Sequence, residues 1–165
     1  MAKPDFIVVM GVSGTGKSEI ARRLAERLGV DWLEADTYHT PENIRRMQHG
    51  EGLTDEMRRP WLTAVALAAL ALPSRPAVVA CSALKRSYRD FLRQRLGNVA
   101  FAFLDGPQEL ILQRLGERRD HFAGASLLSS QLNTLERPMP DECFVTLSIE
   151  WKAMQIVEKA SSAFV

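Results

Sequence analysis

Short apolar runs alternate along the chain with longer segments in which apolar residues recur every three or four positions. The short runs have the length of strands, and several contain almost no polar residue, which is typical of strands buried on both faces of a sheet. Strands are predicted at residues 6–10, 31–36, 77–83, 99–104 and 143–149. Strands that alternate with helices in this way predict an α/β fold, in which helices cover one parallel sheet.

Helices are predicted between these strands from apolar spacing and from start and stop signals. Thr40 followed by Pro41 is a helix start, because the hydroxyl can cap the first turn and proline is tolerated in it. Residues 53–59 are predicted as a loop or a single turn, so that the next helix begins at Pro60. Helices are predicted at residues 18–28, 41–49, 60–72, 85–96, 107–118, 126–136 and 151–160.

Length and composition narrow the class of protein. A chain of 165 residues suits one compact domain, residues 1–165, and a formal net charge of +1 argues against nucleic acid or an anionic membrane as a partner. The longest apolar stretch, residues 62–72, is shorter than the about 20 residues that span a bilayer. The N-terminus has no signal-peptide pattern, and Cys81 and Cys143 have no metal-ligand spacing. A cytoplasmic protein with reduced thiols is expected.

The segment GVSGTGKS matches the phosphate-loop pattern G-x-x-x-x-G-K-[ST] at every fixed position. A strand is predicted before it and a helix after it, which is the context that the pattern requires. Glycines let the backbone N–H groups point inward at phosphates, and the helix N-terminus favours negative charge. In this pattern the lysine reaches the outer phosphates and the last hydroxyl ligates Mg²⁺. The predicted nucleotide-binding residues of the loop are Gly11, Val12, Ser13, Gly14, Thr15, Gly16, Lys17 and Ser18.

Two carboxylates, Glu34 and Asp36, end the second predicted strand. Ligands of open parallel sheets bind beyond the carboxyl ends of the strands, and alternation along a strand puts both side chains on the same side. One carboxylate can hold a water on Mg²⁺, and the other can accept the proton of an attacking hydroxyl, as an aspartate does in kinases. The alternative is a pair of solvated acids at a strand end.

Two basic groups follow later strands. Lys85 and Arg89 are four residues apart, so one helix face can present both to a carboxylate, and a solvated basic face is the alternative. Arg114 and Arg118 lie at the end of a helix, next to a segment, residues 119–125, that is predicted to be mobile. Arginines there can close over a triphosphate and stabilise the charge of the group in transfer.

Several further blocks resemble the small gluconate kinases in order and spacing. These blocks are D-x-x-H at 36–39, G-x-x-L-x-D at 50–55, R-x-P-W-L at 58–62, CSALKRSYRD at 81–90, His121-Phe122, and SQLNTLE at 130–136. The resemblance runs from about residue 7 to residue 138. It implies a three-layer phosphate-loop fold of the nucleoside-monophosphate-kinase and shikimate-kinase type, with sheet order 2-3-1-4-5, helices on both faces and a small mobile lid at about residues 116–125.

The same resemblance implies that ATP phosphorylates D-gluconate to 6-phospho-D-gluconate with Mg²⁺, often in a homodimer. It implies Lys17, Asp36 and Arg118 as catalytic residues, Arg114 and Arg118 as further nucleotide contacts, and Ser18 with Glu34, through water, at the metal. The implied residues for the acid are Asp36, His39, Arg58, Lys85, Arg89 and Gln131. The chain departs from the family at Gly52, Met57, Asp120 and Ala123. A same-fold kinase of another anionic hydroxy acid, such as shikimate, and an ATP-binding module without turnover are the alternatives.

Overall fold

A parallel sheet of five strands, in the order β2-β3-β1-β4-β5, forms the centre of the computed structural model, which describes residues 3–117 and 124–165. The strands are β1 (Phe6–Met10), β2 (Trp32–Glu34), β3 (Ala77–Ala80), β4 (Val99–Asp105) and β5 (Phe144–Ser148). Every residue of β1 and β3 is buried, as expected of strands covered on both faces. The strand order and the parallel pairing confirm the predicted α/β fold.

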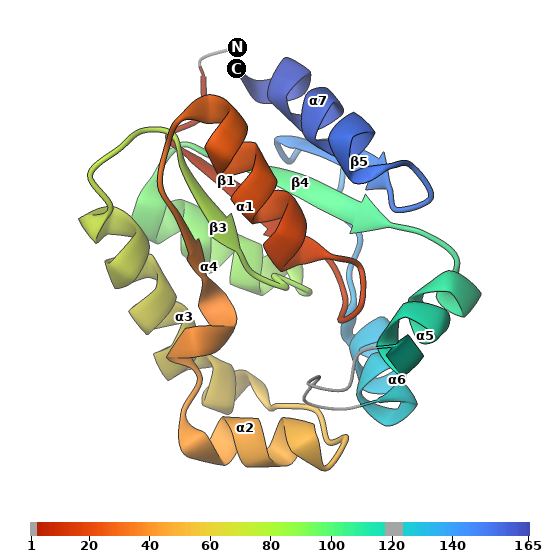
Figure 1. The fold of residues 1–165 in the computed structure, drawn as a ribbon. Coiled ribbons are helices and arrows are strands. Elements are labelled where there is room, and N and C mark those ends of the chain that lie inside the picture. Colours follow the sequence, from red (N-terminus) through yellow and green to blue (C-terminus); the bar gives the residue numbers. More distant parts are fainter. Residues whose placement is uncertain (1–2, 118–123) are drawn as a thin grey trace.

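Helices cover both faces of the sheet, which gives three layers. The helices of one face are α1 (Lys17–Leu28) and α7 (Ala153–Phe164), and those of the other are α3 (Asp55–Ala71) and α4 (Arg86–Leu96). Alternation along β1 divides the core, because Ile7 and Val9 pack with the first pair of helices whereas Val8 and Met10 pack with the second. Figure 1 shows α1 in front of the sheet and α4 behind it.

Shorter helices lie beyond the carboxyl ends of the strands, below the sheet in Figure 1. They are η1 (Ala35–Tyr38), a 3₁₀ turn, and the α-helices α2 (Pro41–Gln48), α5 (Gln108–Glu117) and α6 (Ala125–Thr134). A hydrogen bond of 2.7 Å from Ser126 Oγ to the Gly50 carbonyl joins α6 to the loop after α2. These helices therefore enclose the edge of the sheet at which the phosphate loop emerges.

Helix α3 begins at Asp55, so the prediction that it starts at Pro60 is wrong. Thr54 caps the helix, because its Oγ1 accepts a hydrogen bond of 3.2 Å from the N–H of Met57. Acidic residues fill the first turn, where they meet the positive end of the helix dipole. Pro60 lies inside the helix, where it cannot donate the usual bond to the carbonyl of Glu56. The cap, the acids and the packing of Trp61, Leu62 and Val65 in the core together offset that loss.

Two strands end two or more residues before their predicted ends. β2 ends at Glu34, because the Glu34 side chain accepts from the N–H of Asp36 and starts the 3₁₀ turn. β3 ends at Ala80, and Ala83 has φ of +46°, a left-handed conformation that turns the chain away from the sheet. The predicted lid at 116–125 lies mostly outside the described residues. No described helix has the length and apolarity to cross a membrane.

Candidate active site

The loop between β1 and α1 curls tightly over the N-terminus of α1. Gly14 has φ of +88°, and a Cβ built on it would lie 2.8 Å from Cγ of Leu115, so both conformation and space require glycine. Inside the loop, the Val12 carbonyl accepts hydrogen bonds from Thr15 Oγ1 at 2.8 Å and from Lys17 Nζ at 3.1 Å. The curled backbone and the helix N-terminus together suit a bound polyphosphate.

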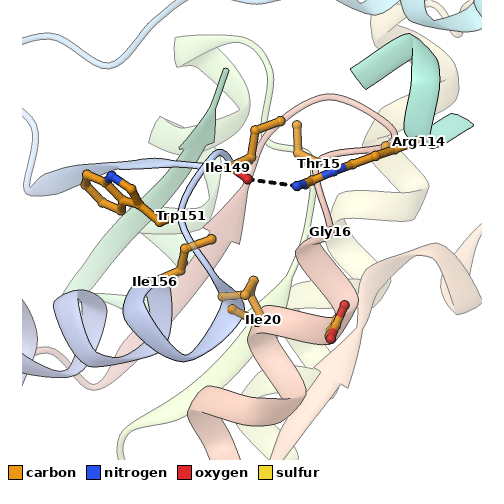
Figure 2. Close-up of a pocket in the computed structure, with 10 residues that line it drawn as sticks. Thr15, Gly16, Ile20, Arg114, Ile149, Trp151 and Ile156 are labelled. Carbon is orange, nitrogen blue, oxygen red and sulfur yellow. Dashed lines mark hydrogen bonds between the residues drawn. The ribbon is translucent and has the colours of Figure 1, made fainter. Parts of the chain in front are cut away.

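A cavity of about 230 Å³ lies between this loop, α1, α5 and the start of α7 (Figure 2). Its apolar wall includes Ile20, Ile149, Trp151 and Ile156. Arg114 Nη2 donates a hydrogen bond of 2.8 Å to the Ile149 carbonyl, which holds the guanidinium at the rim of the cavity. A guanidinium plane beside an apolar wall suits a flat aromatic ring. The structure therefore places Arg114 beside the phosphate loop, as predicted.

Ser18 and Glu34 meet beside the same loop. Ser18 Oγ donates a hydrogen bond to Oε2 of Glu34, and Oε1 of that carboxylate accepts from the N–H of Asp36 at 3.2 Å. Burial raises the pKa of Glu34, and the bond from Ser18 opposes this shift. Hydroxyl and carboxylate oxygens suit Mg²⁺, which takes one or two protein ligands and fills its other positions with water and phosphate. Among the described residues, no group of three or more His, Cys, Asp or Glu side chains could hold a metal.

Asp36 and His39 stand opposite the phosphate loop. His39 stacks on Trp61, with ring centroids 4.2 Å apart, and its Nε2 lies 3.7 Å from Oδ1 of Asp36. Burial lowers the pKa of His39 to about 4, against the charge of Asp36 and with that of Arg58, so the ring is neutral at pH 7. Asn43 Nδ2 lies 3.3 Å from His39 Nδ1 and can only donate to it. The neutral ring therefore carries its proton on Nε2, the atom that faces Asp36.

Arg58 is held by two contacts of one guanidinium nitrogen. Its Nη1 donates to the Leu53 carbonyl at 2.7 Å and to the Tyr88 hydroxyl at 2.8 Å. The Tyr88 hydroxyl in turn donates to Asp55, which also pairs with Lys85 at 3.0 Å. Hydrogen bonds from Tyr88 and Lys85 lower the pKa of Asp55, which keeps it charged. Within residues 3–117 and 124–165, Nε and Nη2 of Arg58 make no hydrogen bond, so that edge of the fork remains for a ligand.

These side chains line one cavity, called here the acceptor cavity. Its lining residues are Ser13, Lys17, Asp36, His39, Met47, Leu53, Arg58, Trp61, Ser82, Leu84, Leu127 and Gln131. The structure therefore brings the phosphate-loop lysine together with Asp36, His39, Arg58 and Gln131, all of which were predicted for this site. Gln131 reaches the loop itself, because its Oε1 accepts a hydrogen bond of 2.7 Å from the N–H of Ser13.

Arg89 does not reach this cavity, so its prediction as an acid-binding residue is wrong. Its side chain is 0% exposed, and its Nε lies 2.8 Å from Oε1 of Glu142, which is 1% exposed. Its Nη1 donates to the carbonyls of Ala83 and Leu84 at 2.9 and 3.2 Å. Lys85 lies beside the acceptor cavity but is not one of its lining residues. Of the three basic residues predicted for the acid, Arg58 alone lines the cavity.

Three residues that build the site were not predicted from the sequence. Asn43 sets the tautomer of His39, and the only sign of it is its spacing of four residues from that histidine. Tyr88 holds Arg58 and Asp55 in turn holds Tyr88, and both residues stand in blocks that carried the resemblance. Arg118, predicted to act on the transferred group, lies outside the described residues, as do His121 and Phe122 of the predicted lid.

The chain is similar to known proteins over most of its length. A family model described as an AAA domain matches residues 6–138, the part of the chain that carries the phosphate loop and the acceptor cavity. The gluconokinase of Gluconobacter oxydans is 46% identical over 150 residues, which cover 90% of this chain and 84% of that protein. The thermoresistant gluconokinase of Escherichia coli is 42% identical over 137 residues, covering 82% of this chain and 78% of that protein.

A solved structure gives the same result. The crystal structure of a gluconokinase from Sinorhizobium meliloti superposes with a TM-score of 0.87 at 44% identity, and the match covers 99% of this chain and 93% of that one. Identity at this level over nearly the whole of both chains extends well beyond the phosphate loop, which many unrelated enzymes share. The chain therefore belongs to the gluconokinase family of phosphate-loop kinases.

Proposed function

We propose that this chain transfers the γ-phosphoryl group of ATP to D-gluconate, giving 6-phospho-D-gluconate and ADP. The observation that carries the proposal is the acceptor cavity, which Lys17, Asp36 and Arg58 line together. A lysine for the phosphates, a carboxylate for a hydroxyl proton and a guanidinium for an acid are the groups that phosphorylation of an anionic alcohol requires. The gluconokinases that match at 46% and 42% identity point to gluconate as that acid.

The nucleotide binds on both sides of the phosphate loop. Its base enters the cavity of about 230 Å³, between the guanidinium of Arg114 and the apolar wall that includes Trp151. Its phosphates accept hydrogen bonds from the loop N–H groups, and Lys17 neutralises their charge. Mg²⁺ would be held by Ser18 directly and by Glu34 through water, and would draw charge from the phosphate oxygens. Arg118 is proposed to neutralise the group in transfer.

The carboxylate of gluconate pairs with Arg58. Nε and Nη2 form the edge of the guanidinium that no other described group binds, and two parallel N–H groups match the two oxygens of a carboxylate. The opposite edge is held by the Leu53 carbonyl and by Tyr88, so the fork is already oriented before the acid binds. A guanidinium that needs little reorganisation loses less entropy on binding.

The reaction is an in-line displacement. The primary hydroxyl oxygen of gluconate attacks the γ-phosphorus, the bond from that phosphorus to the β–γ bridging oxygen breaks, and ADP leaves with the electron pair. The hydroxyl proton passes to a carboxylate oxygen of Asp36. Neutral His39 presents Nε2–H on the same side, so it can donate to the acceptor or to Asp36 while its stack on Trp61 fixes its plane.

Two wider features belong to the same proposal. The enzyme acts on a free small molecule in the cytoplasm, and it assembles as a homodimer. Size-exclusion chromatography with light scattering tests the assembly, and a monomer at assay concentration would contradict it. Cell fractionation tests the location.

The activity itself is tested with a coupled ADP assay over gluconate, shikimate and other sugar acids at millimolar concentration. We expect ADP release that depends on gluconate, with gluconate giving the highest kcat/KM of the panel. A higher kcat/KM for shikimate or for another acid would replace the acceptor but keep the reaction. ATP binding measured by calorimetry, with no turnover on any acid, would show an ATP-binding module and would defeat the proposal.

A further inference from the structure

We propose that Gln131 is a positioning residue that couples binding of the acceptor acid to the conformation of the phosphate loop. The inference rests on the proposed function, because it concerns the acceptor cavity of that reaction. Gln131 lies on α6 and reaches Ser13 across 118 residues of sequence, through a hydrogen bond of 2.7 Å from the Ser13 N–H to Oε1. Among residues 3–117 and 124–165, it is the hydrogen bond by which α6 holds the backbone of the phosphate loop.

The orientation of the Gln131 amide follows from its partner. The backbone N–H of Ser13 can only donate, so the atom that faces it must be the oxygen, and the amide nitrogen is turned away from it. Gln131 and Ser13 both line the acceptor cavity. Within the described parts of the chain, Nε2 donates to no protein oxygen. The amide therefore offers a donor at the wall of the acceptor cavity while its oxygen holds the loop.

Ser13 is the point at which the phosphate loop meets the acceptor cavity. The residue before it, Val12, accepts the internal bonds of the loop from Thr15 and Lys17, so this end of the loop is ordered from within. Ser13 and Lys17 are the two residues of the loop that also line the acceptor cavity. A contact at Ser13 N–H therefore acts on the part of the loop nearest to the transferred phosphoryl group.

Helix α6 is also tied to the acceptor side of the cavity. Ser126 Oγ donates to the Gly50 carbonyl at 2.7 Å, and a Cβ built on Gly52 would lie 2.3 Å from Ser130 Oγ, so the loop after α2 packs directly on α6. Leu127, between those two serines, lines the acceptor cavity. A movement of the loop after α2 when the acid binds is therefore transmitted to α6, and through Gln131 to the phosphate loop.

Coupling follows from the polarity of one amide group. When an oxygen of the acid accepts a hydrogen bond from Nε2, the Gln131 side chain is fixed in the orientation in which Oε1 accepts from Ser13 N–H, so the loop pays less ordering entropy when nucleotide binds. Acceptor binding then stabilises the loop conformation that binds nucleotide. By linkage, nucleotide binding strengthens acceptor binding by the same factor. Gln131 thus favours formation of the ternary complex over binding of ATP alone.

The test measures the affinity of a non-hydrolysable ATP analogue with Mg²⁺ by calorimetry, with and without saturating gluconate. We expect gluconate to tighten analogue binding by about fivefold or more in the unaltered protein, and the ratio to fall to about one in Gln131→Met, which keeps side-chain length but has no hydrogen-bonding amide. The reciprocal measurement, gluconate affinity with and without analogue, must give the same ratio. Asn133→Met, on the exposed part of the same helix, should keep the full ratio.

Two further readouts separate positioning from simple loss of structure. Exchange of the Ser13 amide hydrogen, followed by NMR, should be about fivefold faster in Gln131→Met, as for loss of one ordinary hydrogen bond. Gln131→Glu keeps an oxygen for Ser13 but has no donor, so Ser13 exchange should stay slow while the coupling is lost. This variant decides the matter even if Gln131→Met does not fold.

The outcomes distinguish this inference from the proposed function. Gluconate-dependent turnover with a coupling ratio of one in the unaltered protein would overturn the inference and leave the function standing. A full ratio in Gln131→Met or in Gln131→Glu would overturn it as well. Binding of both ligands with the expected ratios, but with no phosphorylated product, would instead defeat the proposed function and leave the coupling established.

Discussion

Replacing Arg89 with methionine should destabilise the fold more than any surface substitution in α4. Arg89 and Glu142 are 0% and 1% exposed and lie 2.8 Å apart, so water solvates neither charge. The same guanidinium donates to the carbonyls of Ala83 and Leu84, at the left-handed turn that follows β3. Methionine has a similar length, so the substitution removes the charge and the donors while leaving little empty space.

The size of the effect can be worked out from these contacts. Removing one member of a buried ion pair costs about 3–5 kcal/mol, because the remaining charge stays buried without its partner. Glu142 keeps Arg93 Nη1 at 3.1 Å and the Met139 N–H at 2.8 Å, which moderates that loss. The carbonyls of Ala83 and Leu84 lose their donor, which lowers the stability of the variant further. We expect a loss of about 4 kcal/mol, which lowers the Tm by about 8–16 °C at this chain length.

Urea and thermal unfolding of three variants test this reasoning. Arg89→Met should show the full loss, whereas Arg89→Met combined with Glu142→Leu should be more stable than Arg89→Met alone, because neither member of the buried pair is then left without the other. Arg95→Met, at an exposed position of the same helix, should change the free energy of unfolding by less than about 1 kcal/mol. A Tm of Arg89→Met within about 2 °C of the parent would refute the argument. A double variant that is less stable than Arg89→Met would refute it as well.

The pH dependence of this pair has a definite sign. Burial raises the pKa of Glu142, but the bond from Arg89, the bond from the Met139 N–H, the charge of Arg89 and the bond from Arg93 lower it below its ordinary value of 4.5. A lowered carboxyl pKa contributes stability that is present above pH 4.5 and is lost as the pH falls through the folded-state pKa. The stability difference between the parent and Arg89→Met should therefore shrink below about pH 4.5.

Three further predictions concern the proposed reaction. Asp36→Asn should lower kcat about 10²–10⁴-fold while the Kd of an ATP analogue changes little, and a near-normal kcat would remove Asp36 from proton transfer. Tyr88→Phe removes the hydroxyl that holds Arg58, so KM for gluconate should rise about fivefold with KM for ATP unchanged, and an equal rise in both would contradict the assigned sites. The pKa of His39 falls from 6.5 in the unfolded chain to about 4 in the folded protein, so between these values the unfolded chain binds a proton more readily than the folded protein does. The free energy of unfolding of the parent should therefore fall as the pH is lowered from 6.5 to 4, and it should fall much less in His39→Gln, as measured by urea unfolding.

Local features of the chain predicted most of the fold. The phosphate loop is contiguous, and its glycines, lysine and serine carry their chemistry in the order in which they are written. Strands buried on both faces show themselves as apolar runs, and the cap at Thr40 acts within its own turn, with Oγ1 accepting from the N–H of Asn43 at 3.1 Å. The predicted start of α3 is wrong because Pro60 is a strong sign of a helix start, whereas a capping threonine such as Thr54 is a weaker one.

The roles of the residues around the acceptor cavity depend on contacts between distant parts of the chain. Three residues with the same charge stand in equally suggestive motifs, namely Arg58, Lys85 and Arg89. Arg89, however, is paired inside the protein with Glu142, 53 residues away, and Lys85 is paired with Asp55, 30 residues away. Gln131 likewise finds Ser13 at a separation of 118 residues. The order of residues dictates which groups are present and which local turns they make. Their roles depended on long-range packing, because a charged or amide side chain acts on a ligand only with those atoms that no other part of the chain has already bound or buried.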